Sequence, residues 1–424
     1  MAPGARSREE AQRLSACMRF ARNETVVQIA VSLKNDRSTV TRWLVRAEDD
    51  GWISRQPRLT LTSEQLLSLA QTAQDTAKAS RLLELLRTGD SPLQQVLVPY
   101  VLPPLDKELK RDPDAVADRL REVTGRAAAC YINGLIEADP EHVQLGVVWG
   151  RSLRQTVQSL RELPHRPIKA LTVLPLIGNL QVLGDRRREF VRAEANDLSD
   201  TLTSIYAGSP AGSLPVPAFL PKPKRKSDRT LAVLRRYFES MPYYSEIFGT
   251  QGRPGRVWNT RITIIGIGAL DYGGGWPALT QSLSEKDLTQ LEKAGAVGEA
   301  AGQFYDATGL HPPTCRCLLC TTNDRVLAVS LRTLQALARG EIPSTLPREG
   351  QPATRHVIAV TSGARRARAI ISACHHFVTD LVVDELTADA VLEILAPGEA
   401  AAARQAAPAR RRSVSARRRR GKPG

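Results

Sequence analysis

Four side chains that bind soft metal ions lie within ten residues of one another, in the segment His311-Pro-Pro-Thr-Cys315-Arg-Cys317-Leu-Leu-Cys320. Thiolates and imidazoles are the ligands of tetrahedral Zn²⁺ sites, and Cys-x₂-Cys is a common ligand spacing. Two other interpretations also fit the pattern. In the first, the thiols are redox-reactive, because the positive charge of Arg316 would lower the pKa of its neighbouring thiols. In the second, the loop is chemically inert. The sequence therefore predicts a zinc site at Cys315, Cys317 and Cys320 as one of three alternatives, and no other cofactor.

A second group of side chains could bind a nucleic acid. Within Glu24–Ile53, hydroxyl and guanidinium groups recur between apolar positions: Arg37, Ser38, Thr39, Thr41, Arg42 and Arg46. Such groups donate hydrogen bonds to base edges and phosphates, and the first turns of one α-helix fit the major groove of DNA. Our hypothesis is that Thr39 and Arg42 face bases while Arg37 and Arg46 face phosphates.

Glycine-containing turns after apolar runs form the third group. Gly150 precedes Arg151 and Ser152, Gly178 ends a second run, and Gly266 and Gly268 end a third. Backbone N–H groups at the start of a helix, together with a hydroxyl, bind anions, and we expect Ser152 to cap that helix. A glycine after a strand usually marks only a tight turn, so no single one of these turns indicates a binding site.

The apolar spacing around the basic residues predicts a helix-turn-helix. A first helix would pass through Val27, Ile29, Ala30 and Leu33, and the turn KNDR would follow. We expect a second helix to begin with Ser38 as its N-cap and to bury Val40, Trp43, Leu44 and Ala47. Trp52 and Ile53 would then begin a short extended wing.

The rest of the chain alternates short apolar runs with helical stretches, which is typical of a doubly wound α/β domain. The predicted strands lie in QQVLVPYVL, VQLGVVWG, IKALTVLPLIG, ITIIGIGAL, RHVIAVTSG and TDLVVDE, and helical patterns stand between them. Residues 208–230 read as a Pro- and Lys-rich loop, and 309–323 as a surface insertion. In such folds ligands bind at the carboxyl ends of the strands, where the glycine turns lie.

The composition excludes several classes of protein. The 424 residues are 42% hydrophobic, which suffices for a normal core, and six cysteines do not make a disulfide scaffold. Lys and Arg exceed Asp and Glu by 59 to 44, and nine of the basic residues follow Glu399, where no acid remains. No apolar run reaches the roughly 18 residues that cross a bilayer. We therefore expect a cytoplasmic protein with an acidic partner and no membrane contact.

These pieces, in this order, resemble the SorC family of bacterial transcriptional regulators, also described as DeoR-like sugar-binding regulators. The resemblance covers roughly residues 20–396. The segments that carry it are QIAVSLKNDRSTVTRWLVRAEDDGWI, LGVVWGRSL, LTVLPLIGN, IIGIGAL, GAVGEAAGQFYDATG, and SGARRARAI followed by TDLVVDELTADAVL.

The resemblance implies a Rossmann-like effector domain of the ribose-phosphate isomerase or glucosamine-phosphate deaminase type, behind an all-α helix-turn-helix domain. Matched by position, the effector-binding residues would be Gly150, Arg151, Ser152, Gly178, Gly266, Gly268, Glu299, Gly363 and Arg366. Arg366 stands where the family usually has Lys, so it excludes a Schiff base with the ligand. Glu299 also fits a solvated carboxylate, and Arg366 a surface charge.

We therefore expect four parts: a helix-turn-helix domain (1–56), a helical linker (57–90), a sugar-binding domain (91–397) and a disordered basic tail (398–424). The Leu-rich end of the linker could mediate self-association or pack on its own domain. The protein is predicted to be a homo-oligomeric regulator, dimer or tetramer. Binding of a sugar or sugar phosphate would change its affinity for a double-stranded operator. The alternatives are a sugar-phosphate isomerase or deaminase with an added DNA-binding domain, and a nonspecific nucleic-acid binder that uses the tail.

Overall fold

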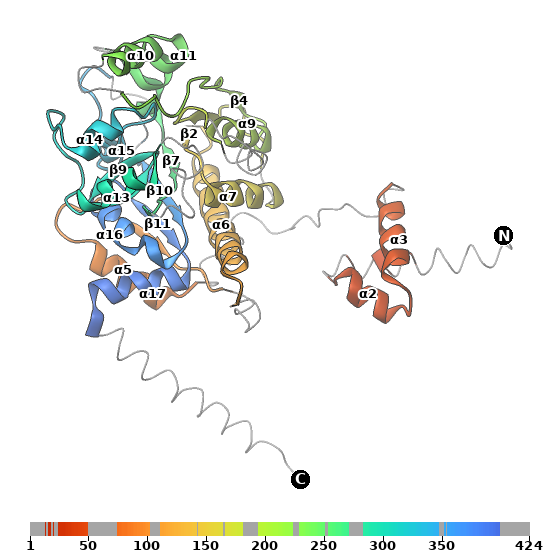
Figure 1. Ribbon diagram of the computed structural model, residues 1–424. Helices are drawn as coiled ribbons and strands as arrows, with labels where there is room; N and C mark the ends of the chain where they lie inside the picture. Colours follow the sequence, from red (N-terminus) through yellow and green to blue (C-terminus); the bar gives the residue numbers. More distant parts are fainter. Residues whose placement is uncertain are drawn as a thin grey trace. The chain divides into compact units, whose positions relative to one another are not determined.

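The protein is described by a computed structural model (Figure 1). It covers residues 13, 16–17, 20, 24–49, 74–101, 111–141, 143–163, 166–180, 194–223, 229–250, 253–270, 283–346, 352 and 354–398. The predicted wing at Trp52, the front of the predicted linker and the basic tail from Glu399 onward lie outside these residues. The chain divides into two compact units, Met1–Thr60 and Leu61–Gly424.

The first unit contains a helix-turn-helix. Helix α2 (Val26–Ser32) begins with a capping box, in which Thr25 accepts the N–H of Gln28 and the Gln28 side chain accepts the N–H of Thr25. Lys34 has a φ of 52°, and the N–H of Asn35 reaches back to the carbonyl of Ala30, which ends α2 sharply. Helix α3 (Arg37–Asp49) follows after this turn and packs on α2.

The two helices share a small core. Its members are Ala16, Cys17, Ile29, Ala30, Val40, Trp43, Leu44 and Ala47. The prediction that Val40, Trp43, Leu44 and Ala47 of the second helix are buried is therefore confirmed. Val27 differs from the expected pattern, because 52% of it is exposed. Ala16 and Cys17 show that the chain ahead of α2 completes this core.

The second unit is built on a seven-stranded sheet in the order β1-β11-β10-β7-β2-β3-β4. Every neighbouring pair is parallel. The strands are β1 (Gln95–Leu97), β2 (Gln144–Val147), β3 (Thr172–Pro175), β4 (Ser209–Pro210), β7 (Ile262–Ile265), β10 (His356–Thr361) and β11 (Asp380–Val383). All six predicted apolar runs contain one of these strands. Their side chains are almost all buried because helices cover both faces of the sheet.

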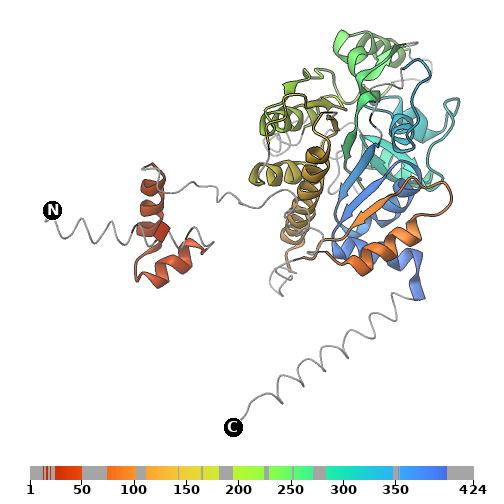
Figure 2. The ribbon, with the colours of Figure 1, turned by 180° about the vertical axis from the view of Figure 1, so that it is seen from behind.

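Helices α6, α7 and α9 lie on one side of the sheet, and α15 and α16 lie on the other (Figures 1 and 2). The helices of this unit are α5 (Thr76–Leu86), α6 (Pro113–Ala138), α7 (Arg151–Glu162), α9 (Ala195–Ile205), α10 (Thr230–Glu239), α11 (Pro242–Phe248), α13 (Glu285–Lys293), α14 (Leu318–Asn323), α15 (Leu331–Ala338), α16 (Ala367–His376) and α17 (Glu385–Leu395), with 3₁₀ turns η2 (Arg256–Asn259) and η3 (Ala364–Arg366). Two antiparallel hairpins complete it: β5 (Gly249–Thr250) with β6 (Arg253–Pro254), and β8 (Ala296–Ala300) with β9 (Gln303–Asp306). Among the described helices, none has the length and apolar character that a bilayer crossing requires.

The structure decides one alternative that the sequence left open and differs from two expectations. The Leu-rich end of the predicted linker is α5, whose Leu82 and Leu86 are fully buried in the core of the second unit, so this end packs on its own unit. The predicted loop at 208–230 contributes β4 to the sheet edge. The predicted surface insertion at 309–323 contains α14, which buries Leu319 in a cluster with Phe304 and Leu291. The pattern missed α14 because one apolar anchor gives no periodicity.

Gly125 sets the distance between α6 and α7. A Cβ atom at this position would lie 2.8 Å from Cγ of Gln155 and 3.0 Å from its backbone carbonyl carbon. We expect Gly125→Val to lower the free energy of unfolding of the second unit by about 1 to 3 kcal/mol, because overpacking forces the helices apart. Thermal melting measures the effect. Gly398→Val is the control, because Gly398 faces open space; equal melting temperatures would contradict the prediction.

Candidate functional site

One face of α3 carries the predicted DNA-binding side chains. Arg37, Ser38, Thr41, Arg42 and Arg46 are exposed and Thr39 is half-buried, whereas the opposite face enters the core. Three guanidinium groups therefore share the solvent-facing surface of one helix. A convex helical surface with several cations suits the phosphates and base edges of a major groove.

The N-terminal end of α3 is capped by Asp36 and not by Ser38, so that expectation was wrong. The Asp36 carboxylate accepts the N–H of Thr39 at 2.8 Å, the Thr39 hydroxyl at 2.7 Å and the Ser38 hydroxyl at 2.5 Å. These hydrogen bonds hold the pKa of Asp36 well below its usual range. Nη2 of Arg42 in turn donates to Oγ1 of Thr39 at 3.1 Å. The cap thus orients Thr39 and Arg42, the two residues that we expect to face bases.

Asp36→Ala is expected to fray the start of α3 and to weaken DNA binding several-fold. The reason is that alanine cannot accept the N–H groups of the first turn, whereas asparagine can. Asp36→Asn is therefore the matched control and should retain most of the affinity. Fluorescence anisotropy with a labelled duplex compares the two. Equal losses in both variants would mean that the charge, and not the cap, matters.

The effector-binding candidates of the second unit lie at one edge of the sheet. Gly150 to Ser152 follow β2, Gly266 and Gly268 follow β7, and Gly363 follows β10. These three strands are neighbours and run in parallel, so their carboxyl ends lie side by side. The turn after β7 lies close to the start of α7. A Cβ atom added at Gly266 would be 3.6 Å from Cδ1 of Leu153. The structure therefore brings three of the predicted turns together.

The turn after β2 leads directly into α7. Gly150 is the N-cap with φ 151° and ψ 152°, and no side chain caps the helix. The expectation that Ser152 is the cap was wrong, because Ser152 already belongs to the first turn. A helix start without a side-chain cap is the kind of terminus at which proteins commonly bind anions.

Glu299 joins this edge through the β8–β9 hairpin. Its backbone forms a reciprocal pair with Gly268, with N–H to O distances of 2.9 and 3.1 Å. The Glu299 side chain lies over Gly268, where a Cβ atom would be only 2.2 Å from Oε1 of Glu299. Oε2 of Glu299 accepts the N–H of Gly302 at 3.1 Å. Gly268 is therefore the residue that lets the hairpin and its carboxylate approach the sheet edge.

The turn after β10 is held by two residues that the sequence-based reasoning did not select. The N–H of Gly363 donates to Oγ1 of Thr387 at 2.6 Å and to Oδ2 of the fully buried Asp384 at 3.3 Å. The guanidinium of Arg366 donates to the carbonyl of Ser362, so Arg366 folds back onto this turn. The signal was the Asp384-x-x-Thr387 spacing, in which Asp384 caps α17.

Gly178, the remaining glycine, serves packing in this structure. It is buried, its N–H donates to the carbonyl of Leu327 at 3.0 Å, and a Cβ would lie 2.4 Å from the carbonyl oxygen of Val216. The close approach of these backbone segments explains the glycine. Its N–H is thus already satisfied by the protein.

The structure also brings together the side chains of the cysteine-rich segment. His311 joins Cys315, Cys317 and Cys320, and the four ligand atoms lie within 4.8 Å of one another. The other three cysteines, Cys17, Cys130 and Cys374, lie in helices, and Cys17 and Cys374 are buried.

Comparisons with known proteins agree with this architecture. Residues 109–339 match the family described as "Putative sugar-binding domain". The transcriptional regulator YjhU of Escherichia coli K12 is 24% identical over 303 residues, covering 71% of this chain and 74% of that protein. The sorbitol operon regulator SorC of Klebsiella pneumoniae is structurally similar, with a TM-score of 0.51 and 18% identity over 89% of this chain and 96% of that one. A DeoR family regulator of Listeria monocytogenes gives a TM-score of 0.52 and 18% identity, covering 75% of this chain and 99% of that one.

Proposed function

This chain belongs to the sugar-binding family of SorC- and DeoR-like regulators, and from this premise we infer that it is a transcriptional regulator whose DNA binding responds to a sugar or sugar phosphate. The single observation that carries the inference is the family match over 109–339, because this range includes the turns after β2 and β7 and Glu299. The resemblance predicted from the sequence is thereby confirmed.

The chemistry of the sheet edge supports a carbohydrate ligand. The start of α7, which no side chain caps, is the type of helix terminus that binds an anion such as a phosphate, and Glu299 carries carboxylate oxygens that can accept from sugar hydroxyls. Arg151 is the first residue of α7 and Arg366 folds back onto the turn after β10, and guanidinium forks match phosphate geometry. We also propose that this domain has the Rossmann-like fold of the ribose-phosphate isomerase or glucosamine-phosphate deaminase type. Gly178 takes part in it only as a packing residue.

The helix-turn-helix supports binding to a double-stranded operator. Thr39 and Arg42 would face bases, and Arg37 and Arg46 would face phosphates. The three arginines are exposed on α3, and the half-buried Thr39 is hydrogen-bonded to Arg42. In a dimer or tetramer, two such helices would contact half-sites about 34 Å apart. The ligand changes operator affinity only if the two conformations of the oligomer bind it with different affinity. Such a regulator works in the cytoplasm.

The test combines two measurements on the full chain. Selection from a random duplex library identifies the operator, and thermal melting with a panel of sugars and sugar phosphates identifies the ligand. A ligand at 100 times its Kd should stabilise the second unit by about 2.7 kcal/mol. It should then change operator affinity, and Glu299→Gln should weaken both effects.

The same panel decides against the alternatives. Turnover of the stabilising sugar phosphate would identify an isomerase or deaminase instead of a sensor. DNA binding that shows no sequence preference, and that is lost when residues 400–424 are removed, would identify a nonspecific binder that uses the tail.

A further inference from the structure

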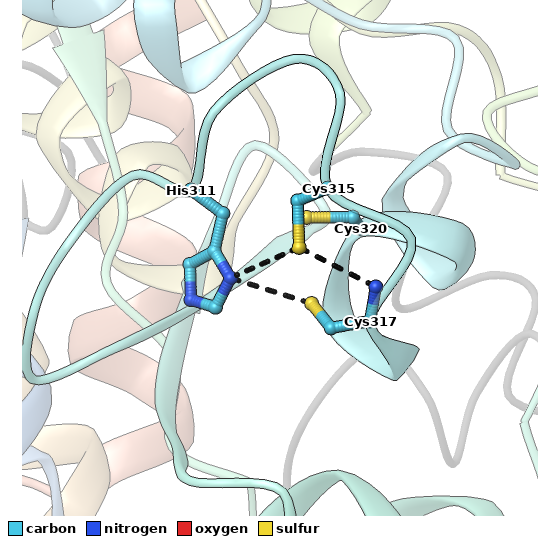
Figure 3. Close-up of side chains that lie close together, drawn as sticks. All are labelled: His311, Cys315, Cys317 and Cys320. Atoms are coloured by element: carbon cyan, nitrogen blue, oxygen red, sulfur yellow. Dashed lines mark hydrogen bonds between the residues drawn. The ribbon is translucent and has the colours of Figure 1, made fainter.

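A cluster of one imidazole and three thiols lies between β9 and α15, in the segment that contains α14 (Figure 3). Nδ1 of His311 is 3.5 Å from Sγ of Cys315 and 3.3 Å from Sγ of Cys317. The four ligand atoms, including Sγ of Cys320, lie within 4.8 Å of one another. In a tetrahedral zinc site with Zn–S of about 2.3 Å and Zn–N of about 2.0 Å, the ligand atoms are about 3.5 to 3.8 Å apart. The observed spacing is close to that of a complete ligand shell.

Local structure holds the three thiols in this arrangement. A turn closed by the N–H of Cys315 and the carbonyl of Pro312 places Cys315 opposite His311. Cys317 is the N-cap of α14, and Cys320 lies one turn further along this helix. The buried Leu319 anchors the helix in the core, so the two cysteines of the Cys-x₂-Cys pair are fixed relative to the rest of the unit.

The second ring nitrogen of His311 has the partner that a metal-binding histidine requires. Nε2 lies 2.6 Å from Oδ2 of Asp306, and the other carboxylate oxygen accepts the N–H and hydroxyl of Thr308 at 2.8 and 2.7 Å. A proton on Nε2 that is donated to a carboxylate leaves Nδ1 with its lone pair toward the thiols. Histidine ligands in metal sites commonly donate their other N–H to a carboxylate in this way.

Further contacts suit a site with three thiolates. The N–H of Cys317 points to Sγ of Cys315 at 3.4 Å. Two cations also approach the loop: Arg316 donates to the carbonyl of Cys315, and Arg332 donates to the carbonyl of His311. Zn²⁺ with three thiolates has a net charge of −1, and neighbouring N–H groups and guanidinium groups oppose this charge.

We propose that His311, Cys315, Cys317 and Cys320 bind one Zn²⁺ in a closed, structural site with Asp306 as the partner of His311. Four protein ligands complete the tetrahedron, so no position remains for a substrate. The role of the ion is to fasten the loop from Gly309 to α14 against β9. An oriented imidazole can also activate a single thiol for redox chemistry, but a redox sensor does not need a third thiol at ligand spacing, and the convergence of four donor atoms is why the geometry favours the metal.

The first test measures metal in the full chain, purified under reducing conditions after growth with added zinc. Mass spectrometry of the metal content should give one zinc per chain. Replacement by Co²⁺ should give the intense visible bands of tetrahedral cobalt together with sulfur-to-cobalt charge transfer. Thiol reagents should modify the three cysteines slowly, and rapidly after a strong chelator removes the ion.

The second test uses matched variants. Cys315→Ser and Cys317→Ser should lower the affinity for zinc at least tenfold, whereas Cys130→Ser, which changes a cysteine of α6, should leave it unchanged. Asp306→Asn retains all four ligands, and we expect it to weaken zinc binding by about tenfold to a hundredfold. Competition with a chromophoric chelator measures each affinity. If a serine variant fails to fold, the cobalt spectrum of the unsubstituted chain and Asp306→Asn still decide the question.

Three results would overturn the proposal. The first is a full chain with no bound zinc and with all three thiols reacting rapidly before chelation, as a thiol sensor or inert loop would. The second is an octahedral cobalt spectrum. The third is equal zinc affinity in the unsubstituted chain and Cys317→Ser. None of these outcomes depends on sugar or DNA binding, so the zinc site and the proposed regulatory function fail separately.

Discussion

Trp43→Ala is expected to abolish DNA binding while the second unit stays folded. Trp43 is 6% exposed and lies in the small core shared by α2 and α3. Removing a buried tryptophan side chain costs about 3 to 5 kcal/mol, which is most or all of the stability that a unit of this size can have. The two units have separate hydrophobic cores, so the damage should stay in the first. Electrophoretic mobility with operator DNA measures the loss.

Val31→Ala is the control for this prediction, because 75% of Val31 is exposed on α2 and its removal leaves no cavity. This variant should bind DNA as the unsubstituted chain does. Thermal melting in the presence of the stabilising sugar reports on the second unit, and Trp43→Ala should show the full ligand-induced shift. A Trp43→Ala protein that still binds its operator would show that α2 and α3 do not depend on this core.

Gly268→Ala should remove the response to the ligand. The added methyl carbon would lie 2.2 Å from Oε1 and 2.9 Å from the carboxyl carbon of Glu299, so the carboxylate has to leave its place at the sheet edge. We expect the ligand-induced thermal shift to fall by at least half, because a displaced Glu299 cannot accept the sugar hydroxyls. Operator binding should persist and should no longer respond to the ligand.

Gly266→Ala is the steric comparison. Its methyl group would meet only Cδ1 of Leu153 at 3.6 Å and the carbonyl oxygen of Trp149 at 3.9 Å, which are ordinary contacts. The melting temperature without ligand should therefore fall less in Gly266→Ala than in Gly268→Ala. Unchanged ligand response in Gly268→Ala would show that Glu299 is not part of the site.

Hydrophobic patterning predicted most of the fold. The parallel strands are buried on both faces, so β2, β7 and β10 read as continuous apolar runs ended by glycine. The pattern could not predict β4, because two residues are too short to show any periodicity. The predicted N-cap of α3, Ser38, is two residues after the observed one, Asp36. Both residue types are good N-caps, and only the folded turn selects Asp36.

The candidate site was predicted less completely. Residues that follow strands in the sequence were found, because parallel topology alone brings Gly150, Gly266 and Gly363 to one edge. Asp384 follows β11 at the same edge, but it was missed because the sequence-based reasoning considered glycine turns and not the residue that caps the next helix. The pairing of His311 with Asp306 was missed as well, since a histidine five residues after a carboxylate carries no signal until the loop folds back.

The β8–β9 hairpin carries a consequence for evolution. Glu299 lies near the closed end of this ribbon and pairs with Gly268, whereas Asp306 lies at the open end. The strand that contains Asp306 is fixed to α16, because the Tyr305 hydroxyl donates to the Ala369 carbonyl and the Ser372 hydroxyl donates to the Asp306 carbonyl. In the two proposals above, the ribbon serves the effector site through Glu299 and the zinc site through Asp306, so a substitution in it affects two unrelated sites at once. In lineages of this protein that lose the cysteines, we expect substitutions to appear first at Asp306. The residues around Glu299 should still be conserved.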